Sequence, residues 1–396
     1  MLSLDKVFNA QTVLKSIVRE TKLVRAYGIA PECELYLKPE NLQITGSFKV
    51  RGSAYKIAML SEEEKAKGVI ACSAGNHAQG VALAATKNGI KSLICLPDAA
   101  PISKVEATKG YGADVCLVEG CYDDAYQKAL ELRDKEGYTF VHPFDDENVI
   151  AGQGTIALEI LNDLDNIDAI VVPIGGGGLI SGVAYTAKQI RPSIKIYGVQ
   201  AAGAPSMYNS VKDGDVERLT SVSTIADGIA VKQPGENTYS IVKEYVDEIA
   251  LVSDDEVSSA ILALIEKQKM IAEGAGAVAV AAVMFNKFNL KNKRVVAVVS
   301  GGNIDVTSLS RVIDRGLLKS GRSSSLLIER IHKPGQLKDI SRIIADCGGN
   351  VTGVHYEKGD TESVNGCFLR IEMETRDFEH VNLITKSLRD EGFKLV

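Results

Sequence analysis

The sequence has no tryptophan, no Cys-x-x-Cys pair, no long apolar run and no excess of basic residues. Its longest apolar run, residues 275–285, falls short of the roughly 18 to 20 residues that cross a bilayer, so we expect no membrane-spanning segment. Residues 1–12 lack the apolar stretch and cleavage site of a signal peptide. The net charge of −6 argues against a nucleic-acid partner, which would need a basic surface.

The seven cysteines are odd in number and scattered along the chain. This pattern argues against a zinc knuckle or a disulfide framework, and we expect no bound metal. Free thiols suit a reducing compartment, so the sequence predicts a cytoplasmic location. Four histidines show no metal-ligand spacing and are interpreted as structural: His142, His332, His355 and His380. The H-E-x-x-H and G-x-S-x-G motifs are also absent.

Glycine is the residue in excess, since 36 occur in 396 residues, or about 9% against a usual value of about 7%. The length also exceeds the roughly 150 residues of one domain. Between about residues 40 and 320, short β-branched runs alternate with amphipathic stretches, which predicts an α/β fold with helices packed on a mostly parallel sheet. The expected strands are 69–72, 92–96, 169–173, 194–200 and 294–299, and the expected helices include 78–88, 103–110 and 254–271.

The pattern changes after residue 318. Residues 319–325 are small and polar and predict a linker. Beyond them, residues 326–396 follow the order strand, helix, strand, strand, helix, strand, which predicts a small ferredoxin-like βαββαβ module. Its first helix is expected to open at Pro334-Gly335, and its last strand is expected at 393–396.

Gly175 to Gly178 lie between a predicted strand and a predicted helix, where open α/β sheets bind ligands. Their unobstructed N–H groups suit a phosphate, although a plain flexible turn is the alternative. They do not form the G-x-x-x-x-G-K-[ST] motif of a nucleoside triphosphate site. Residues 152–157 match G-x-G-x-x-A but follow a polar stretch instead of a strand, so we reject them as a dinucleotide site.

Lys49 stands at the start of a helix that runs to Met59. The helix dipole, the nearby Arg51 and partial burial beside Phe48 should all lower the pKa of its amine. A neutral amine is what Schiff-base chemistry with a carbonyl needs, so Lys49 is a candidate nucleophile, and a solvated surface lysine is the alternative.

Two further turns follow predicted strands. Ser73-Ala74-Gly75-Asn76-His77 opens a helix, and its free N–H groups suit a carboxylate. Ser300 presents a hydroxyl to which a ring nitrogen could bind. Glu273 lies among small apolar residues and is either a buried functional carboxylate or an acid at a helix end. Each of these signals alone is also compatible with an ordinary turn.

Together, four motifs resemble those of the pyridoxal-phosphate enzymes of fold type II, and in particular the threonine ammonia-lyase (threonine dehydratase) family. They are Ser-Phe-Lys-Val-Arg-Gly at 47–52, Ser-Ala-Gly-Asn-His-Ala-Gln-Gly at 73–80, the tetraglycine at 175–178 and Ser-Gly-Gly-Asn at 300–303. The resemblance covers roughly residues 1–320. It implies a catalytic domain at 1–318 with a two-lobed, open twisted sheet like that of tryptophan synthase β, the smaller lobe lying at roughly 52–150. Residues 326–396 resemble an ACT domain, a regulatory module that binds amino acids.

The resemblance also implies a role for each motif. Lys49 would hold pyridoxal 5'-phosphate and later remove the substrate Cα proton. Phe48 would pack near the cofactor ring, Asn76 would bind its phenolic oxygen, Gly175 to Gly178 its phosphate and Ser300 its pyridine nitrogen. The substrate-binding residues would be Ser73, Ala74, Gly75, Asn76, His77 and Glu273. A neutral serine does not stabilise a pyridinium, and the weaker electron sink suits elimination of a β-hydroxyl.

The implied reaction is deamination of L-threonine to 2-oxobutanoate and ammonia, and of L-serine to pyruvate. An amino-acid effector, with isoleucine and valine as candidates, would act through the ACT domain of a homodimer or homotetramer. A biosynthetic role, feeding isoleucine, and a catabolic role both stay open.

Related serine racemases carry a serine where this chain has Ala74 and an acidic metal ligand where it has Gln200. The first difference argues against racemisation, and the second argues against a divalent metal at that position. A β-replacement enzyme of the same fold and a non-catalytic amino-acid sensor stay open as well.

Overall fold

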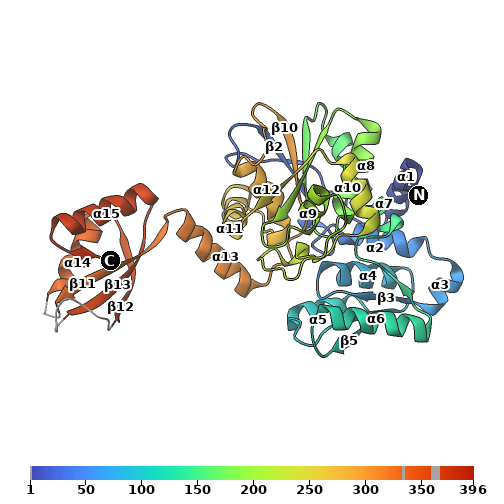
Figure 1. Cartoon of the computed structure of the whole chain (residues 1–396), viewed down its shortest axis with the longest axis horizontal. Helices are drawn as coiled ribbons and strands as arrows, with labels where there is room; N and C mark the ends of the chain where they lie inside the picture. Colours follow the sequence, from blue (N-terminus) through green and yellow to red (C-terminus); the bar gives the residue numbers. More distant parts are fainter. Residues whose placement is uncertain (1, 332–334, 358–365) are drawn as a thin grey trace. The chain divides into compact units, whose positions relative to one another are not determined.

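A computed structural model describes residues 2–331, 335–357 and 366–396. The chain separates into two compact units, Met1–Val306 and Thr307–Val396. The first unit holds two sheets, and the second holds one (Figure 1). Among the described residues, no helix is both long enough and apolar enough to span a membrane.

The larger sheet of the first unit has six strands in the order β1-β2-β10-β7-β8-β9. All neighbours are parallel except β1, which is antiparallel to β2. The strands are β1 (Val24–Arg25), β2 (Glu34–Pro39), β7 (Ala169–Pro173), β8 (Lys195–Ala201), β9 (Glu248–Val252) and β10 (Arg294–Val299). The predicted strands at 169–173 and 294–299 are confirmed, and the one predicted at 194–200 begins and ends one residue later.

Helices cover this sheet on both faces. One face packs against α7, α8 and α10, whose apolar residues share a cluster with alternate residues of the central strands, and α12 packs against the other. The helices are α1 (Leu4–Leu14), α7 (Glu147–Asp163), α8 (Gly178–Ile190), α9 (Ser206–Asp213), α10 (Glu236–Tyr245), α11 (Asp254–Ala263) and α12 (Gly274–Met284), with short turns η1 (Glu40–Leu42), η2 (Asp227–Ile229) and η3 (Leu264–Gln268). Each face of the sheet is therefore apolar and is covered by helices.

The prediction of one helix over 254–271 is wrong at its C-terminal end. The α-helix stops at Ala263, and η3 continues it as a single wide turn with π-type hydrogen bonding. Lys269 then adopts φ 57°, the left-handed conformation that ends a helix. A pattern of apolar residues does not reveal such a change in hydrogen bonding.

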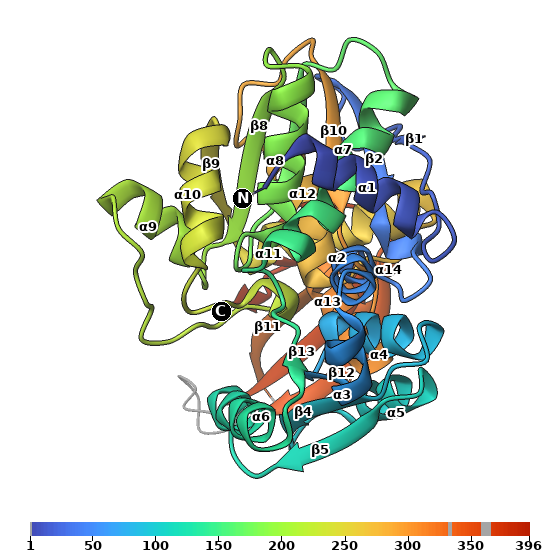
Figure 2. The same ribbon diagram turned by 90° about the vertical axis from the view of Figure 1, so that its right-hand side faces the viewer.

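The smaller sheet has four parallel strands in the order β5-β4-β3-β6. Its elements are α3 (Glu62–Lys67), β3 (Val69–Cys72), α4 (Asn76–Lys87), β4 (Ser92–Pro97), α5 (Ile102–Gly110), β5 (Asp114–Val118), α6 (Tyr122–Glu136) and β6 (Thr139–Phe140). Helices α4 and α5 pack on one face and α6 on the other (Figure 2). This sheet lies inside the range 52–150 that the sequence suggested for a smaller lobe.

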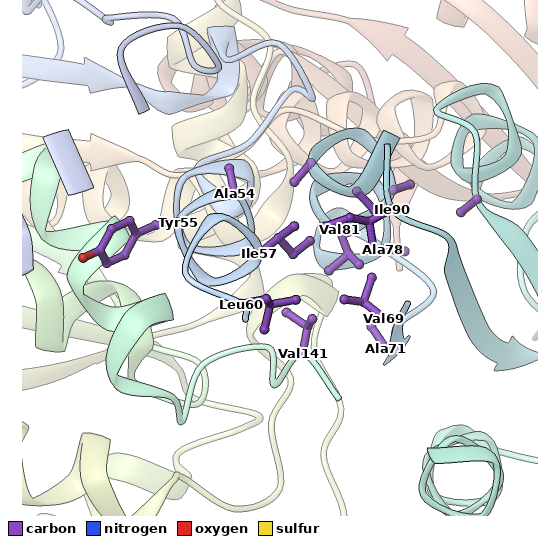
Figure 3. Close-up of a cluster of buried hydrophobic side chains, with 14 of the residues drawn as sticks. Ala54, Tyr55, Ile57, Leu60, Val69, Ala71, Ala78, Val81, Ile90 and Val141 are labelled. Carbon is purple, nitrogen blue, oxygen red and sulfur yellow. The ribbon is translucent and has the colours of Figure 1, made fainter. Parts of the chain in front are cut away.

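Helix α2 (Lys49–Ala58) packs against α4 of the smaller lobe and α7 of the larger one. Its residues Ala54 and Ile57 enter an apolar cluster with Val69, Val81 and Val141 (Figure 3). Full burial of one such aliphatic side chain contributes about 1.5–3 kcal/mol to stability. This packing fixes the position of the first residue of α2, which is Lys49.

The second unit contains α13 (Val306–Lys319), except for its first residue, and a sheet in the order β12-β13-β11-β14. The elements of the sheet and its helices are β11 (Ser323–Ile331), α14 (Gln336–Asp346), β12 (Asn350–Glu357), β13 (Gly366–Glu374), α15 (Phe378–Asp390) and β14 (Lys394–Leu395). The strands pair antiparallel, and both helices contribute to one apolar cluster with the sheet. The predicted βαββαβ order is confirmed. Pro334 lies outside the described residues, and Gly335 is the N-cap of α14.

The predicted linker at 319–325 is mostly regular structure. Lys319 ends α13, and Ser323 to Ser325 belong to β11, where Ser323 pairs with Glu374. Backbone pairing with β13 outweighs the small polar side chains that suggested a loop, so only 320–322 connect the two elements. Helix α13 groups with the second unit, whereas the sequence placed residues up to 318 in the first.

Candidate active site

One cavity of about 760 Å³ lies in the first unit, lined by residues from both lobes. Its wall includes residues that follow the carboxyl ends of β3, β6, β7 and β10, where parallel sheets bind ligands. Every site residue proposed from the sequence lies on it: Phe48, Lys49, Ser73, Ala74, Gly75, Asn76, His77, Gly175, Gly176, Gly177, Gly178, Glu273 and Ser300. The fold therefore brings four separate motifs to one place.

Lys49 projects its amine into this cavity. Its Nζ donates a hydrogen bond to the Pro143 carbonyl oxygen at 2.8 Å and lies 5.4 Å from the centre of the Phe48 ring. Loss of water around the amine lowers the pKa of Lys49 to about 8, and the negative charge of Glu273 opposes this shift. About one amine in ten is therefore neutral at pH 7, far more than for a lysine of ordinary pKa.

Arg51 does not contribute to that shift as the sequence suggested. Its fully buried guanidinium binds Glu40 through Nε at 2.8 Å and Glu159 through Nη1 at 2.6 Å. Lys38 also pairs with Glu159, so two cations and two carboxylates form a buried network. The Arg51 side chain is therefore part of this network. The pKa of Lys49 is lowered by burial.

The turn Gly175–Gly178 joins β7 to α8. Gly177 has φ 100° and is the N-cap of α8, which has no side-chain cap. Within the described part of the chain, the amides of Gly176, Gly177 and Gly178 have no protein acceptor. A Cβ on Gly176 would lie 2.4 Å from the Phe144 ring, so glycine is required sterically. Uncapped N–H groups at a helix N-terminus form a site for an anion such as phosphate.

The turn Ser73–His77 has the same character. Gly75 is the N-cap of α4 and offers no side-chain cap, and among the described residues the amides of Asn76 and His77 have no protein acceptor. The His77 ring is engaged elsewhere, because its Nε2 lies 2.8 Å from the Val141 carbonyl oxygen. Burial lowers the pKa of His77 to about 3, so the ring is neutral. The free main-chain N–H groups of Asn76 and His77 are therefore the groups of this turn that suit an anion.

Glu273 fits both descriptions that the sequence left open. It is the N-cap of α12, and it is also buried in the cavity wall. Its Oε1 accepts a hydrogen bond from Asn76 Nδ2 at 2.7 Å, and Asn303 Nδ2 donates to Asn76 Oδ1 at 2.7 Å. Burial raises the pKa of Glu273 to about 7, and the Asp227 charge acts in the same direction. Ser300 lies nearby on the wall, and its Oγ donates to the Ala275 carbonyl oxygen at 3.2 Å.

Comparison with known proteins identifies the family. Residues 14–301 match the model of a pyridoxal-phosphate dependent enzyme. The chain belongs to the pyridoxal-phosphate dependent enzymes. It is 48% identical to the L-threonine ammonia-lyase of Thermotoga maritima over 100% of this chain and 99% of that protein.

Two solved structures show the same fold as this pyridoxal-phosphate enzyme. The processed form of threonine deaminase isoform 2 from Solanum lycopersicum is 40% identical, with a TM-score of 0.75 over 80% of this chain and 90% of that one. Maize serine racemase is 34% identical, also with a TM-score of 0.75, over 80% of this chain and 98% of that one. The predicted fold type II architecture is thereby confirmed.

The residues of the cavity fit this cofactor chemically. Lys49 supplies an amine of lowered pKa for the aldehyde, and the glycine turn supplies free N–H groups for the phosphate. Ser300 supplies a hydroxyl, and Asn76 supplies an amide side chain, both on the same wall. No part of this set conflicts with a phosphorylated pyridine aldehyde.

Sequence reasoning missed one wall of this pyridoxal-phosphate enzyme's cavity. His142, Pro143, Phe144 and Asp145 line it, although His142 was interpreted only as a structural residue. They follow β6, a strand of two residues that is too short to recognise by alternation, yet they obey the same rule of residues at a carboxyl strand end. The rejection of 152–157 as a nucleotide site is confirmed, because those residues lie inside α7.

Proposed function

We propose that this chain deaminates L-threonine to 2-oxobutanoate and ammonia, and L-serine to pyruvate. The observation that supports it most directly is the Lys49 amine on the same cavity wall as two uncapped, anion-binding turns. One turn suits a phosphate and the other suits the carboxylate of an amino acid. The 48% identity to a named L-threonine ammonia-lyase over the whole chain supports the choice of substrate.

Pyridoxal phosphate, when bound, stabilises the negative charge that forms at the amino-acid Cα. In this proposal Lys49 holds the cofactor and then takes the Cα proton on its neutral amine. With a pKa of about 8, about one amine in ten is neutral at pH 7. Gly175–Gly178 bind the phosphate, Phe48 packs near the ring and Asn76 binds its phenolic oxygen.

The remaining residues hold and select the substrate. The main-chain N–H groups of Asn76 and His77 would bind the carboxylate, in the same cavity as the Lys49 amine. The neutral Ser300 hydroxyl meets the ring nitrogen, which limits the lifetime of charge at Cα and favours loss of the β-hydroxyl. The Cα proton and the β-hydroxyl leave as water, and water then hydrolyses the enamine to the 2-oxo acid and ammonia. Glu273 lies beside the substrate and binds Asn76.

The test is the variant Lys49→Ala. We expect loss of the visible absorption of bound cofactor and at least about a hundredfold loss of 2-oxo acid production, as for removal of a general base. Lys65→Ala on the surface of α3 is the matched control, and it should keep both properties. Normal threonine turnover in Lys49→Ala would contradict the proposal.

Serine racemisation is the second candidate, favoured by the structural similarity to maize serine racemase. Ala74 carries no group that moves a proton on the second face of the substrate, so we expect no D-serine from L-serine. A chiral assay of the reaction mixture separates the two activities. Turnover of threonine without any added nucleophile would in turn exclude a β-replacement enzyme, and colourless protein that takes up no cofactor would favour a non-catalytic sensor.

Control by an amino acid through residues 326–396 is part of the same proposal. The βαββαβ unit, with its own apolar cluster, supports a folded module that binds a ligand. We expect isoleucine or valine to change threonine turnover by an amount equivalent to about 1–3 kcal/mol of coupling. Assays of the full chain with and without each amino acid test this, and gel filtration tests the proposed homodimer or homotetramer. A cytoplasmic location stays a prediction.

A further inference from the structure

The segment His142–Asp146, of which His142 to Asp145 line the cavity, is held by contacts to several elements at once. The Pro143 carbonyl oxygen accepts a hydrogen bond from the Lys49 amine. Phe144 lies against the glycine turn, since a Cβ on Gly178 would be 2.9 Å from Phe144 Cα. Asp146 caps α7 by accepting from the Val149 amide at 3.1 Å. Asp145 lies between these residues, and its side chain has a different partner.

Asp145 caps a helix to which it does not belong. Its Oδ1 accepts the N–H of Thr238, the third residue of α10, at 3.1 Å. The N-cap of α10 is Gly235, which has no side chain to do this. A Cβ on Gly235 would lie 2.2 Å from Asp145 Cγ, so glycine at this N-cap leaves room for the carboxylate of another segment.

Thr238 also forms a hydrogen bond with the glycine turn. It is fully buried, and its Oγ1 donates to the Gly176 carbonyl oxygen at 2.6 Å. The peptide group between Gly176 and Gly177 is trans, so its C=O and N–H point in opposite directions. The Gly176 carbonyl oxygen also accepts the Gly235 N–H at 3.4 Å, so two bonds from the start of α10 turn the Gly177 N–H away from Thr238, and the Thr238 bond is the shorter one. Among the described residues the Gly177 N–H has no protein acceptor.

We propose that Asp145 and Thr238 are positioning residues for phosphate binding: Asp145 fixes the first turn of α10, and the Thr238 hydroxyl orients the peptide whose N–H binds the cofactor phosphate. The inference deepens the proposed function and rests on its assignment of the glycine turn to the phosphate. Asp145 brings a negative charge to the cavity wall, where charge alone would weaken anion binding. The capping bond is therefore the contribution to be isolated.

The test compares pyridoxal phosphate with pyridoxal, which lacks the phosphate. Both are titrated into cofactor-free full-length protein, and binding is followed by absorbance. For Thr238→Val, which keeps the shape and removes the hydroxyl, we expect about a five- to tenfold weaker affinity for pyridoxal phosphate. The affinity for pyridoxal should change less than about twofold, because it makes no phosphate contact. Thr238→Ser keeps the hydroxyl, so its ratio of pyridoxal phosphate affinity to pyridoxal affinity should equal that of the wild type.

The variants of Asp145 separate capping from charge. Asp145→Ala removes both and should weaken pyridoxal phosphate binding about fivefold, as loss of a helix cap does. Asp145→Asn keeps an oxygen acceptor without the charge and should bind at least as tightly as wild type. Asp377→Ala is the matched control, since Asp377 caps α15 in the other unit at 2.8 Å, and it should leave both affinities unchanged.

Equal losses for the two ligands in Thr238→Val would overturn the proposal, because they indicate general damage to the cavity. Tighter phosphate binding in Asp145→Ala would also overturn it, since charge would then outweigh capping. If Thr238→Val does not fold, Thr238→Ala and the Asp145 pair give the same comparison. Protein that binds pyridoxal phosphate but does not deaminate threonine would contradict the proposed function and leave this test valid.

Discussion

The buried charge network beneath Lys49 gives a stability prediction with a defined sign. Arg51 joins α2 to Glu40 of η1 and to Glu159 of α7, and it has no exposed surface. The variant Arg51→Met keeps the side-chain volume and removes the charge. Glu40 then keeps the Thr21 hydroxyl at 2.5 Å, and Glu159 keeps Lys38. One buried carboxylate is left without a balancing cation.

The expected loss of stability is about 3–5 kcal/mol, the range measured when one partner of a buried ion pair is removed. The double variant Arg51→Met/Glu40→Gln balances the charges again, because Lys38 and Glu159 remain paired. It should therefore be more stable than Arg51→Met alone, although it carries two substitutions. This order of stabilities distinguishes the effect of an unpaired charge from that of lost packing. Loss of packing alone would make the double variant less stable than the single variant.

The pH dependence follows from Glu159. Burial raises the pKa of Glu159, but the hydrogen bonds and charge of Arg51 and the charge of Lys38 outweigh it and leave the pKa lowered. A lowered folded-state pKa contributes stability above the unfolded value of about 4.3 and loses it as the pH falls through the folded value. Without Arg51, only Lys38 remains to lower the pKa of Glu159, so this contribution to stability becomes smaller. The difference between wild type and Arg51→Met should therefore widen as the pH rises from the lowered folded-state pKa to about 4.3, and stay constant above it.

Urea unfolding of the three proteins at several pH values measures these differences. Far-UV circular dichroism is the suitable probe, because the chain has no tryptophan to report by fluorescence. A loss below about 1 kcal/mol in Arg51→Met, the size of an exposed ion pair, would refute the reasoning. A double variant less stable than the single variant would refute it as well.

Two further predictions concern the cavity itself. Gly176→Ala places a Cβ 2.4 Å from the Phe144 ring, so we expect a roughly 5- to 150-fold loss of pyridoxal phosphate affinity from overpacking of about 1–3 kcal/mol, measured by absorbance titration. Burial and the Asp227 charge raise the pKa of Glu273 to about 7, so the pH profile of kcat should contain a limb near pH 7 that Glu273→Gln removes. Asp227→Asn should move that limb to lower pH, and an unmoved limb would exclude Glu273 as its source.

The sequence alone determined the repeating α/β pattern, the βαββαβ tail and the motifs of the site. These features depend on neighbouring residues only. The spacing of apolar side chains predicts a strand or a helix, and glycines between them predict a turn with exposed N–H groups. The parallel strands at 169–173 and 294–299 and the turns at 73–77 and 175–178 that begin helices could be predicted for this reason. The excess of glycine also indicated segments where other groups pack closely against the main chain.

Only the tertiary structure decided which partners the side chains meet. Arg51 was expected to act on Lys49, yet it binds Glu40 and Glu159, because residues two apart on a helix point in different directions. The wall of His142–Asp145 and the cap that Asp145 gives to α10 join segments 93 residues apart, and no local pattern encodes such a contact. Long-range hydrogen bonds and burial set the orientation and the pKa values of the site, and both depend on the folded surroundings instead of the neighbouring residues.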